Sequence, residues 1–383
     1  MKKTFKKIMS VILAVLMIAT TVPFAFAGVT ASGTFGSGSS LTWELDSDGK
    51  LTVSGTGAMP NYGYATDTPW FNQYRGSIKS VVVSEGVTTV GRMSFSYLSN
   101  LTSVTLPSTV TSINDGAFGG NVKLTEITIP KNVSSFGADV FYGCKALEKF
   151  NVNSESSYFK SVDGVLYSKD GKTLVLYPIN KKGESYTVPA GTERIGESAF
   201  SKNINLRKLV ISEGVTTIVR EAFTEALNLT TVTIPSTVTV IDSYAFADCT
   251  SLTTVTIADG VKRIGSGAFA RDTMLENLVI PSSAEKIEDA FNGCKTVHYL
   301  GAESDATVAS GIDELHFTVY TTGTAATCMN TGTTDSYFCT ECNKTISGAE
   351  ELPIDKNAHN FDTAGKKVRP SYNIKTKTWS DGY

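Results

Sequence analysis

A phenylalanine recurs every 23 residues through the middle of this chain, and this period limits the folds that the sequence can adopt. The regular copies are Phe200, Phe223, Phe246 and Phe269, each directly preceded by Ala. Further copies at similar spacing are Phe95, Phe118, Phe141 and Phe291. A fixed period of this length is typical of a solenoid, in which each repeat forms one coil that covers the next. We therefore expect a stack of coils with the phenylalanines packed inside.

Each repeat also contains a short run that reads as a β-strand, such as Val232-Thr233-Ile234, usually closed by Pro. A second short apolar pair follows it, such as Val261 and Ile264. Apolar residues alternate with Thr or Val in the first run, so one side should be buried and the other open. The open positions predicted on a concave sheet face are Val82, Thr105, Thr128, Asn151, Thr187, Val210, Thr233, Thr256, Val279 and His298. They are candidate binding residues, although the same pattern also suits a face that is merely soluble.

The period is interrupted once, between Phe141 and Phe200. That gap is 59 residues, which is one period of 23 plus 36 extra residues. Two β-like runs flank the turn Lys169-Asp170-Gly171-Lys172 within it, so residues 150–189 are interpreted as an elaborated hairpin coil that remains in the stack. The alternative is a projecting arm that binds a partner.

The N-terminal residues indicate export followed by a cap. Residues 1–27 combine a basic start, an apolar core and the small-x-small site Ala25-Phe26-Ala27, as in a secretory signal peptide. A membrane anchor is less favoured because the apolar run is short. Residues 28–78 are predicted to cap the first coil, with a flexible start over 28–40 and then a β-hairpin. An alternative role for Trp43 or Trp70 in this region is to bind carbohydrate.

The charge balance argues against a nucleic-acid partner. The whole chain has a net charge of −3, and removing residues 1–27 removes four lysines and no acidic residue, which leaves −7. A protein that binds nucleic acid needs basic side chains to neutralise phosphates, and no basic stripe is present.

Three cysteines belong to the repeat. Cys144, Cys249 and Cys294 each lie three residues after a repeat phenylalanine. Coils stack at roughly 4.8 Å, so two cysteines separated by two coils lie too far apart for a disulfide. We expect three free thiols at a semi-buried coil corner, without a catalytic role.

The C-terminal part differs from the repeats. Residues 301–315 are interpreted as a linker, and residues 316–383 as a separate Cys-rich module. A structural zinc site is predicted there from Cys328, Cys339 and Cys342, with His359 or His316 as the fourth ligand. The alternatives are a disulfide among the three cysteines with one left over, which export favours, and three unpaired thiols. The solenoid itself needs no cofactor.

The repeat pattern resembles a known family. Val-Thr-Ile-Pro, followed by Ala-Phe and Cys-x-x-Leu between Val232 and Leu252, is similar to the BspA-type leucine-rich repeat of bacterial surface proteins. Residues 159–188 resemble the long variant of that repeat, and residues 43–74 an entry module placed before it. The spacing from His316 to Cys342 resembles tandem Cys-rich modules of secreted clostridial-type proteins, with a degenerate second copy starting at His359. The resemblance implies a curved solenoid over residues 79–300, with a parallel sheet on one face, short helical turns and a role in adhesion or protein binding.

The sequence contains no recognisable catalytic motif. The chain has three histidines, none of them in a zinc-protease motif, and it has no nucleophile elbow or phosphate loop. We therefore expect a non-catalytic secreted or surface protein that binds an extracellular protein or glycan, without a transmembrane segment once the signal is removed. The alternatives are a structural spacer that displays the C-terminal module, and an extracellular enzyme of unrecognised type.

Overall fold

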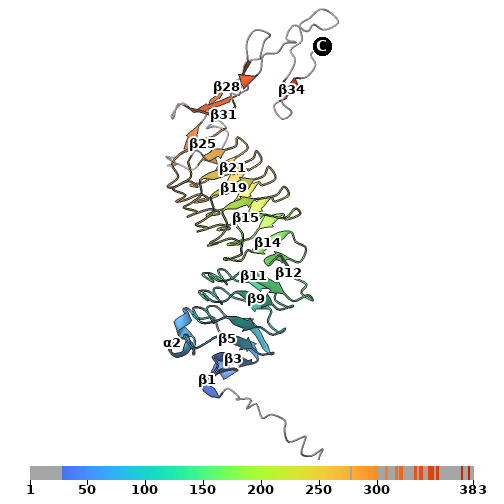
Figure 1. Ribbon diagram of the computed structural model, residues 1–383, viewed down its shortest axis with the longest axis vertical. Coiled ribbons are helices and arrows are strands. Elements are labelled where there is room, and N and C mark those ends of the chain that lie inside the picture. The colour runs from blue at the N-terminus through green and yellow to red at the C-terminus, as the bar shows by residue number, and fades with distance from the viewer. Residues whose placement is uncertain are drawn as a thin grey trace, which may run out of the picture.

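The computed structural model describes residues 28–276 and 278–300, and beyond them only short backbone strands between Thr307 and Trp379. The described chain forms one elongated stack of coils, with β1 near one end and β25 near the other (Figure 1). Within these residues, helix is confined to α2 (Phe71–Tyr74) and two short 3-10 turns, Ser37–Ser39 and Ala65–Asp67. The structure is therefore a β-solenoid with very little helix.

The first coil is covered by an antiparallel sheet. Strands β1 (Val29–Phe35), β2 (Leu41–Asp46) and β3 (Lys50–Gly55) pair in order, and β3 pairs in parallel with β5 (Ser80–Val83). The predicted hairpin is confirmed, but the prediction of a flexible start was wrong. Phe35 is buried against Trp70, and Gly33 lies against the Trp43 ring, where a Cβ would come within 2.7 Å of Nε1. These contacts hold β1 in place.

The first run of each repeat forms one row of parallel strands. Residues 23 apart stand side by side, as Val232 and Val255 do. The strands after β5 are β7 (Ser103–Thr105), β9 (Glu126–Ile129), β11 (Lys149–Val152), β15 (Ser185–Thr187), β17 (Lys208–Val210), β19 (Thr231–Ile234), β21 (Thr254–Ile257), β23 (Leu278–Ile280) and β25 (Val297–Tyr299). The 23-residue period of the sequence therefore sets the register between neighbouring strands.

The second apolar pair of each repeat forms another row. Its strands before the interruption are β4 (Gly57–Ala58), β6 (Val87–Val90), β8 (Ser112–Ile113) and β10 (Ser135–Phe136). After it come β14 (Thr173–Leu176), β16 (Arg194–Ile195), β18 (Thr217–Ile218), β20 (Val240–Ile241), β22 (Arg263–Ile264), β24 (Lys286–Ile287) and β26 (Thr307–Val308). In addition, β27 (Leu315–Phe317) pairs with β25 in the first row. Strand pairing therefore extends beyond residue 300, into the segment predicted as a linker.

Further strands belong to the C-terminal segment. Strand β30 (Ser336–Cys339) pairs with both β28 (Val319–Thr321) and β31 (Lys344–Gly348), β29 (Gly332–Thr333) pairs with β32 (Glu351–Leu352), and β33 (Tyr372–Asn373) pairs with β34 (Thr378–Trp379). All four pairings are antiparallel.

The residues inserted after Phe141 form a hairpin that joins the stack on one side. Strands β12 (Phe159–Val162) and β13 (Val165–Ser168) pair antiparallel, β13 pairs antiparallel with β14, and β14 pairs in parallel with β16. Tyr177 then takes the place of a repeat phenylalanine: it lies 23 residues before Phe200, and the two rings stack at 4.6 Å. The insertion therefore lies between Phe141 and Tyr177 and contains this hairpin.

The aromatic rings form two internal stacks. The first runs from Trp70 through Phe95 and Phe118 to Phe141, with ring centroids 5.5 to 5.8 Å apart. The second runs from Tyr177 to Phe291, with neighbouring centroids 4.6 to 6.1 Å apart. Trp70 is fully buried and its Nε1–H donates to the Ser94 carbonyl at 3.0 Å, so the carbohydrate alternative was wrong for this residue.

A row of backbone hydrogen bonds joins the coils at the corner that carries the phenylalanine. In the regular coils, such as those of Phe95, Phe118 and Phe223, three N–H groups donate to carbonyls of the next coil, at the Phe and two residues to either side. In the Phe118 coil, Gly116, Phe118 and Gly120 donate at 2.9, 3.0 and 2.6 Å. The outer two residues have positive φ, near 60° to 70°, which points all three N–H groups the same way. The glycine at these positions is replaced by other residues in several coils, for example Ser198 and Glu221.

The repeat cysteines form further hydrogen bonds between coils at the same corner, on its buried side. The Sγ–H groups of Cys144, Cys249 and Cys294 donate to the Phe118, Phe223 and Phe269 carbonyls of the preceding coils, each at 3.1 Å. None of the three forms a disulfide and all are buried, which confirms the expected thiols but places them deeper than predicted. Asn121 fills the equivalent position with its amide, which donates to Phe95 O at 2.9 Å and to Phe118 O at 2.7 Å.

Candidate functional site

The predicted open positions lie side by side on the first row of strands. Val82 pairs with Thr105, Thr128 with Asn151, and Thr187, Val210, Thr233 and Thr256 follow one another in register. Thr105, Thr128, Thr187, Thr233 and Thr256 are exposed, while Val82, Asn151, Val210 and Val279 are half-buried. Nine of the ten predicted positions are therefore accessible, and they form a row that we call the sheet face.

His298 is not part of this face. Its side chain is fully buried, together with those of Val297 and Tyr299 on the same strand. The prediction placed His298 among the open positions of the concave face, and this was wrong; β27 also pairs with its strand β25, with His316 opposite His298. The sheet thus continues past residue 300, where the solenoid was expected to end.

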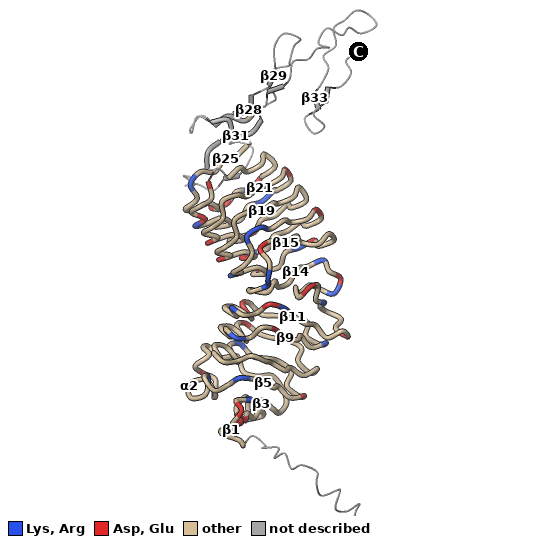
Figure 2. Tube along the Cα trace, viewed as in Figure 1, with Lys and Arg blue, Asp and Glu red and all other residues tan. Residues whose placement is uncertain are grey.

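The sheet face carries little charge. Its main ion pair joins Lys149 to Glu126 at 2.6 Å, and the Asn151 amide donates to Glu126 at 3.2 Å. The hydrogen bond from Lys149, followed by that from Asn151, holds the pKa of Glu126 below its usual range. Elsewhere, Lys and Arg are interspersed with Asp and Glu along the stack (Figure 2). The face therefore offers short hydroxyl and methyl groups in a regular array.

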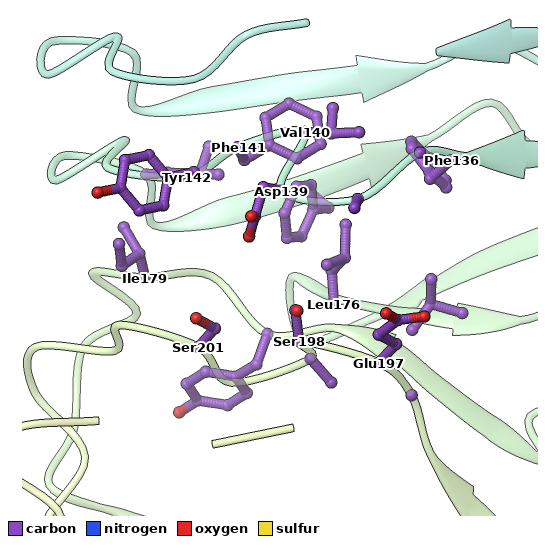
Figure 3. A pocket seen from close by; sticks show the side chains of 18 of the residues that line it. Phe136, Asp139, Val140, Phe141, Tyr142, Leu176, Ile179, Glu197, Ser198 and Ser201 are labelled. Carbon is purple, nitrogen blue, oxygen red and sulfur yellow. The ribbon is translucent and has the colours of Figure 1, made fainter. Parts of the chain in front are cut away.

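A cavity of about 360 Å³ lies where the two aromatic stacks are interrupted, and we call this junction the seam. One wall comes from the Phe141 coil and the other from the Tyr177 and Phe200 coils (Figure 3). Its apolar lining consists of Phe136, Val140, Phe141, Leu147, Phe150, Phe159, Val175, Leu176, Tyr177 and Ile179. A second hollow, of about 270 Å³, shares Ala138, Asp139 and Tyr142 with it and continues along the corner towards Tyr97.

The rim of the seam is polar and carries two acidic side chains and one basic side chain. Asp139, Glu197, Ser198, Ser201 and Lys202 line it. Partial desolvation, followed by the charge of Glu221, raises the pKa of Asp139. The Lys202 ammonium lies 4.1 Å from the centroid of the Tyr142 ring and bonds Glu225 at 2.7 Å, so its charge is already compensated.

Sequence reasoning missed this cavity because it interpreted the extra residues of the 59-residue gap as an elaborated coil that remains in the stack. The signal was present in Tyr177, which keeps the 23-residue spacing to Phe200 and so marks the end of the insertion. The step from Phe141 to Tyr177 is 36 residues instead of 23, which locates the place where one coil does not continue directly into the next.

The predicted metal ligands fall outside the part of the chain with described side chains. Cys328, Cys342 and His359 lie outside the described residues, and Cys339 and His316 are described only as backbone positions in β30 and β27. In the part of the chain that the structure describes, no cluster of three His, Cys, Asp or Glu side chains is arranged to hold a metal ion. Among the same residues, no helix has both the length and the apolar character needed to cross a membrane.

Solved structures with the same fold come from several bacteria. A leucine-rich repeat protein from Eubacterium ventriosum is 30% identical over 70% of this chain and 86% of its own, with a TM-score of 0.50. A leucine-rich cell surface protein from Faecalibacterium prausnitzii is 23% identical over 71% of this chain and 96% of its own, with a TM-score of 0.54. The pneumococcal vaccine antigen PcpA is 20% identical over 76% of this chain and 94% of its own, with a TM-score of 0.53. No curated protein matches the sequence.

The repeats themselves match a family model. Six copies of the BspA-type leucine-rich repeat region cover residues 69–162 and 179–298, which together make up more than half of the chain. The unmatched residues between these two ranges, 163–178, include strand β13 of the inserted hairpin and Tyr177. The coils, their 23-residue register and this match together show that the chain belongs to the BspA-type leucine-rich repeat family.

Proposed function

We propose that this protein is a non-catalytic, secreted or surface-located binding protein that presents the sheet face to an extracellular protein or glycan. The observation that carries this proposal is the row of exposed threonines held in register by parallel strands, as at Thr233 and Thr256. Because each strand is fixed by its neighbours, the row is formed before any ligand arrives. A preformed surface loses little conformational entropy on binding.

The chemistry of the face favours a neutral ligand surface. Threonine hydroxyls donate and accept hydrogen bonds, while their methyl groups and the adjacent Val210 side chain supply apolar contact. Sugars and uncharged protein surfaces offer matching hydroxyl, amide and apolar groups. The location is supported by the signal-like residues 1–27, and the fold relative from Faecalibacterium is named a cell surface protein.

The test compares two variants of the full chain. Thr233→Arg with Thr256→Arg places two large cations on the sheet face, while Thr216→Arg with Thr239→Arg places two on exposed positions beside the other row of strands. Both are screened against a glycan array, purified peptidoglycan and a panel of extracellular-matrix proteins. We expect binding by the unmodified chain that only the first variant loses.

Equal binding by both variants would contradict a role for the sheet face. Binding that instead requires residues 316–383 would favour the alternative, in which the solenoid is a spacer that displays the C-terminal module. A chain in which only residues 316–383 are replaced by a flexible Gly/Ser segment separates these two outcomes.

A further inference from the structure

The seam is the position at which one aromatic ring is missing from the interior. Trp70, Phe95, Phe118 and Phe141 stack in turn, and the next stack starts at Tyr177. Phe141 and Tyr177 both line the cavity that separates the stacks. A cavity of roughly 150 Å³ with apolar walls is large enough for a benzene ring, and the seam offers about 360 Å³. The space therefore accommodates an aromatic side chain between two aromatic neighbours.

The backbone at the same place lacks its usual partners. In the Phe118 and Phe223 coils, all three corner N–H groups donate to the next coil. The corresponding groups of the Phe141 coil belong to Asp139, Phe141 and Gly143, and none of them has an acceptor among the described residues. Asp139 and Gly143 keep the positive φ of this corner, at 52° and 67°, so the three donors point into the seam as they do elsewhere. Hydrogen-bond donors without partners at a structured edge are the feature that an added strand uses.

The charges at the rim determine which kind of hydrogen-bond acceptor can bind the N–H groups of the seam. A row of N–H groups in this conformation also attracts anions. Here, however, the carboxylates of Asp139 and Glu197 stand at the rim, with Glu221 close enough to raise the pKa of Asp139. Lys202 is engaged by Glu225 and Tyr142. A neutral row of peptide carbonyls next to a basic side chain therefore suits the seam better than a free anion.

We propose that the seam is a docking site for an extended segment of a partner protein in which an aromatic residue is flanked by Lys or Arg. The aromatic ring enters the cavity between Phe141 and Tyr177 and continues the internal stack. Carbonyls of the segment accept hydrogen bonds from the N–H groups of Asp139, Phe141 and Gly143. The basic side chains pair with Asp139 and Glu197. This site is separate from the sheet face, and it neither requires nor excludes a ligand there.

The test uses a capped peptide, Gly-Lys-Thr-Phe-Thr-Lys-Gly, with the full chain in a calorimeter. We expect saturable binding at a single site, at least tenfold weaker when the Phe of the peptide is replaced by Ala. Ser201→Phe places a ring in the cavity and should abolish binding. Thr224→Phe, at the equivalent position of the next coil and outside the cavity, is the matched control and should leave it unchanged.

A second variant tests the charge. Asp139→Asn keeps a residue that tolerates positive φ but removes the carboxylate. This variant should bind the Lys-containing peptide several-fold more weakly. Its binding of a peptide with Ser in place of both Lys residues should be unchanged. Three results would overturn the proposal: no binding up to millimolar peptide, equal binding by the Phe and Ala peptides, or p-cresol alone binding as tightly as the peptide. Each is independent of the arginine variants of the sheet face, so the two proposals fail separately.

Discussion

The rings of Phe223 and Phe246 lie 4.7 Å apart and within 1° of parallel. Both are fully buried, and their coils are joined by a backbone bond of 2.7 Å from Phe223 N to Ala245 O. Each ring is thus held by its own coil and covered by the next. Stability in such a stack is approximately a sum of coil contributions and nearest-neighbour interfaces.

Phe223→Ala should therefore destabilise the solenoid by about 3–5 kcal/mol, because the neighbouring rings are fixed and cannot collapse into the cavity. Thr233→Ala, on the sheet face, removes no core volume and should change stability by less than about 0.5 kcal/mol. Urea unfolding of both variants without residues 1–27 measures the difference. Equal losses of unfolding free energy in the two variants would mean that the assignment of inner and outer faces is wrong.

Amide hydrogen exchange should identify the seam directly. The N–H groups of Asp139, Phe141 and Gly143 lack acceptors among the described residues, whereas those of Gly116, Phe118 and Gly120 are bonded to the next coil. The first three should exchange markedly faster than the second three in the native state, because protection follows hydrogen bonding and burial. Nuclear magnetic resonance resolves these six amides. Equal protection would show that the Phe141 coil is closed in solution.

Asp272 should make stability fall as the pH rises. It occupies the corner position of Asn121, and its Oδ1 accepts from Cys249 N at 2.8 Å, while Oδ2 is buried without a partner among the described residues. Burial, reinforced by Asp248 and opposed by the Cys249 hydrogen bond and Arg271, raises the pKa of Asp272 from 3.8 to about 9. The folded state keeps a proton that the unfolded state releases, so stability decreases between about pH 4 and 9, by up to about 1.4 kcal/mol per unit.

Asp272→Asn should remove most of this dependence, because the amide N–H can donate as Asn121 does. The variant should therefore gain stability over the unmodified chain as the pH rises from 5 to 8, measured by urea unfolding at both values. Asn121→Asp is the reciprocal control and should introduce the same fall with pH. A parallel pH profile for Asp272→Asn and the unmodified chain would exclude a protonated Asp272.

The three repeat cysteines should resist modification until the solenoid unfolds. Burial raises the pKa of Cys144 to about 12, and burial together with Asp272 raises the pKa of Cys249. Thiolates are the reactive form, so both thiols should be inert at neutral pH. Labelling with a thiol reagent across a urea series should follow the unfolding curve. Rapid labelling in native buffer would contradict the deep corner position.

The C-terminal zinc site stays a prediction. If Cys328, Cys339 and Cys342 bind zinc with His359 or His316, about one zinc per chain should be found in reduced protein. Chelation should then change the C-terminal segment without melting the coils, because metal binding supplies folding free energy to a small module. Less than about 0.2 zinc per chain after saturation would favour the disulfide alternative.

Sequence periodicity was sufficient for most of the fold. Alternation around Thr233 determines which side of the strand is buried, and the spacing of Phe223 and Phe246 determines the register, because both depend only on local pattern and coil length. The structure of the cap could not be predicted from periodicity in the same way. Trp70 takes the place of a phenylalanine at a spacing of 25 residues, and β1 is held by tertiary contacts of Phe35 and Gly33 that no local pattern reports.

The candidate sites show more clearly what cannot be predicted from the sequence alone. The sheet face can be predicted from alternation alone, but His298 was misplaced because β27 pairs with its strand from beyond the last recognised repeat. The seam depends on three backbone donors that lack acceptors among the described residues, and backbone pairing between coils cannot be read from side-chain identity. No sequence motif distinguishes Asp272, because its acidity departs from that of an ordinary carboxyl only through the buried corner around it.

Among the described residues, the N–H groups of Asp139, Phe141 and Gly143 have no acceptor, and this affects how the molecule would respond to mechanical load. A solenoid pulled along its axis carries the tension in series through every interface between coils, so the interface with the fewest bonds yields first. At the seam the inserted hairpin still connects the two halves, and the step from Phe141 to Tyr177 is 36 residues rather than 23, which provides slack that the regular interfaces between neighbouring coils do not have. A pull along the axis would therefore open this junction before the stacked coils on either side.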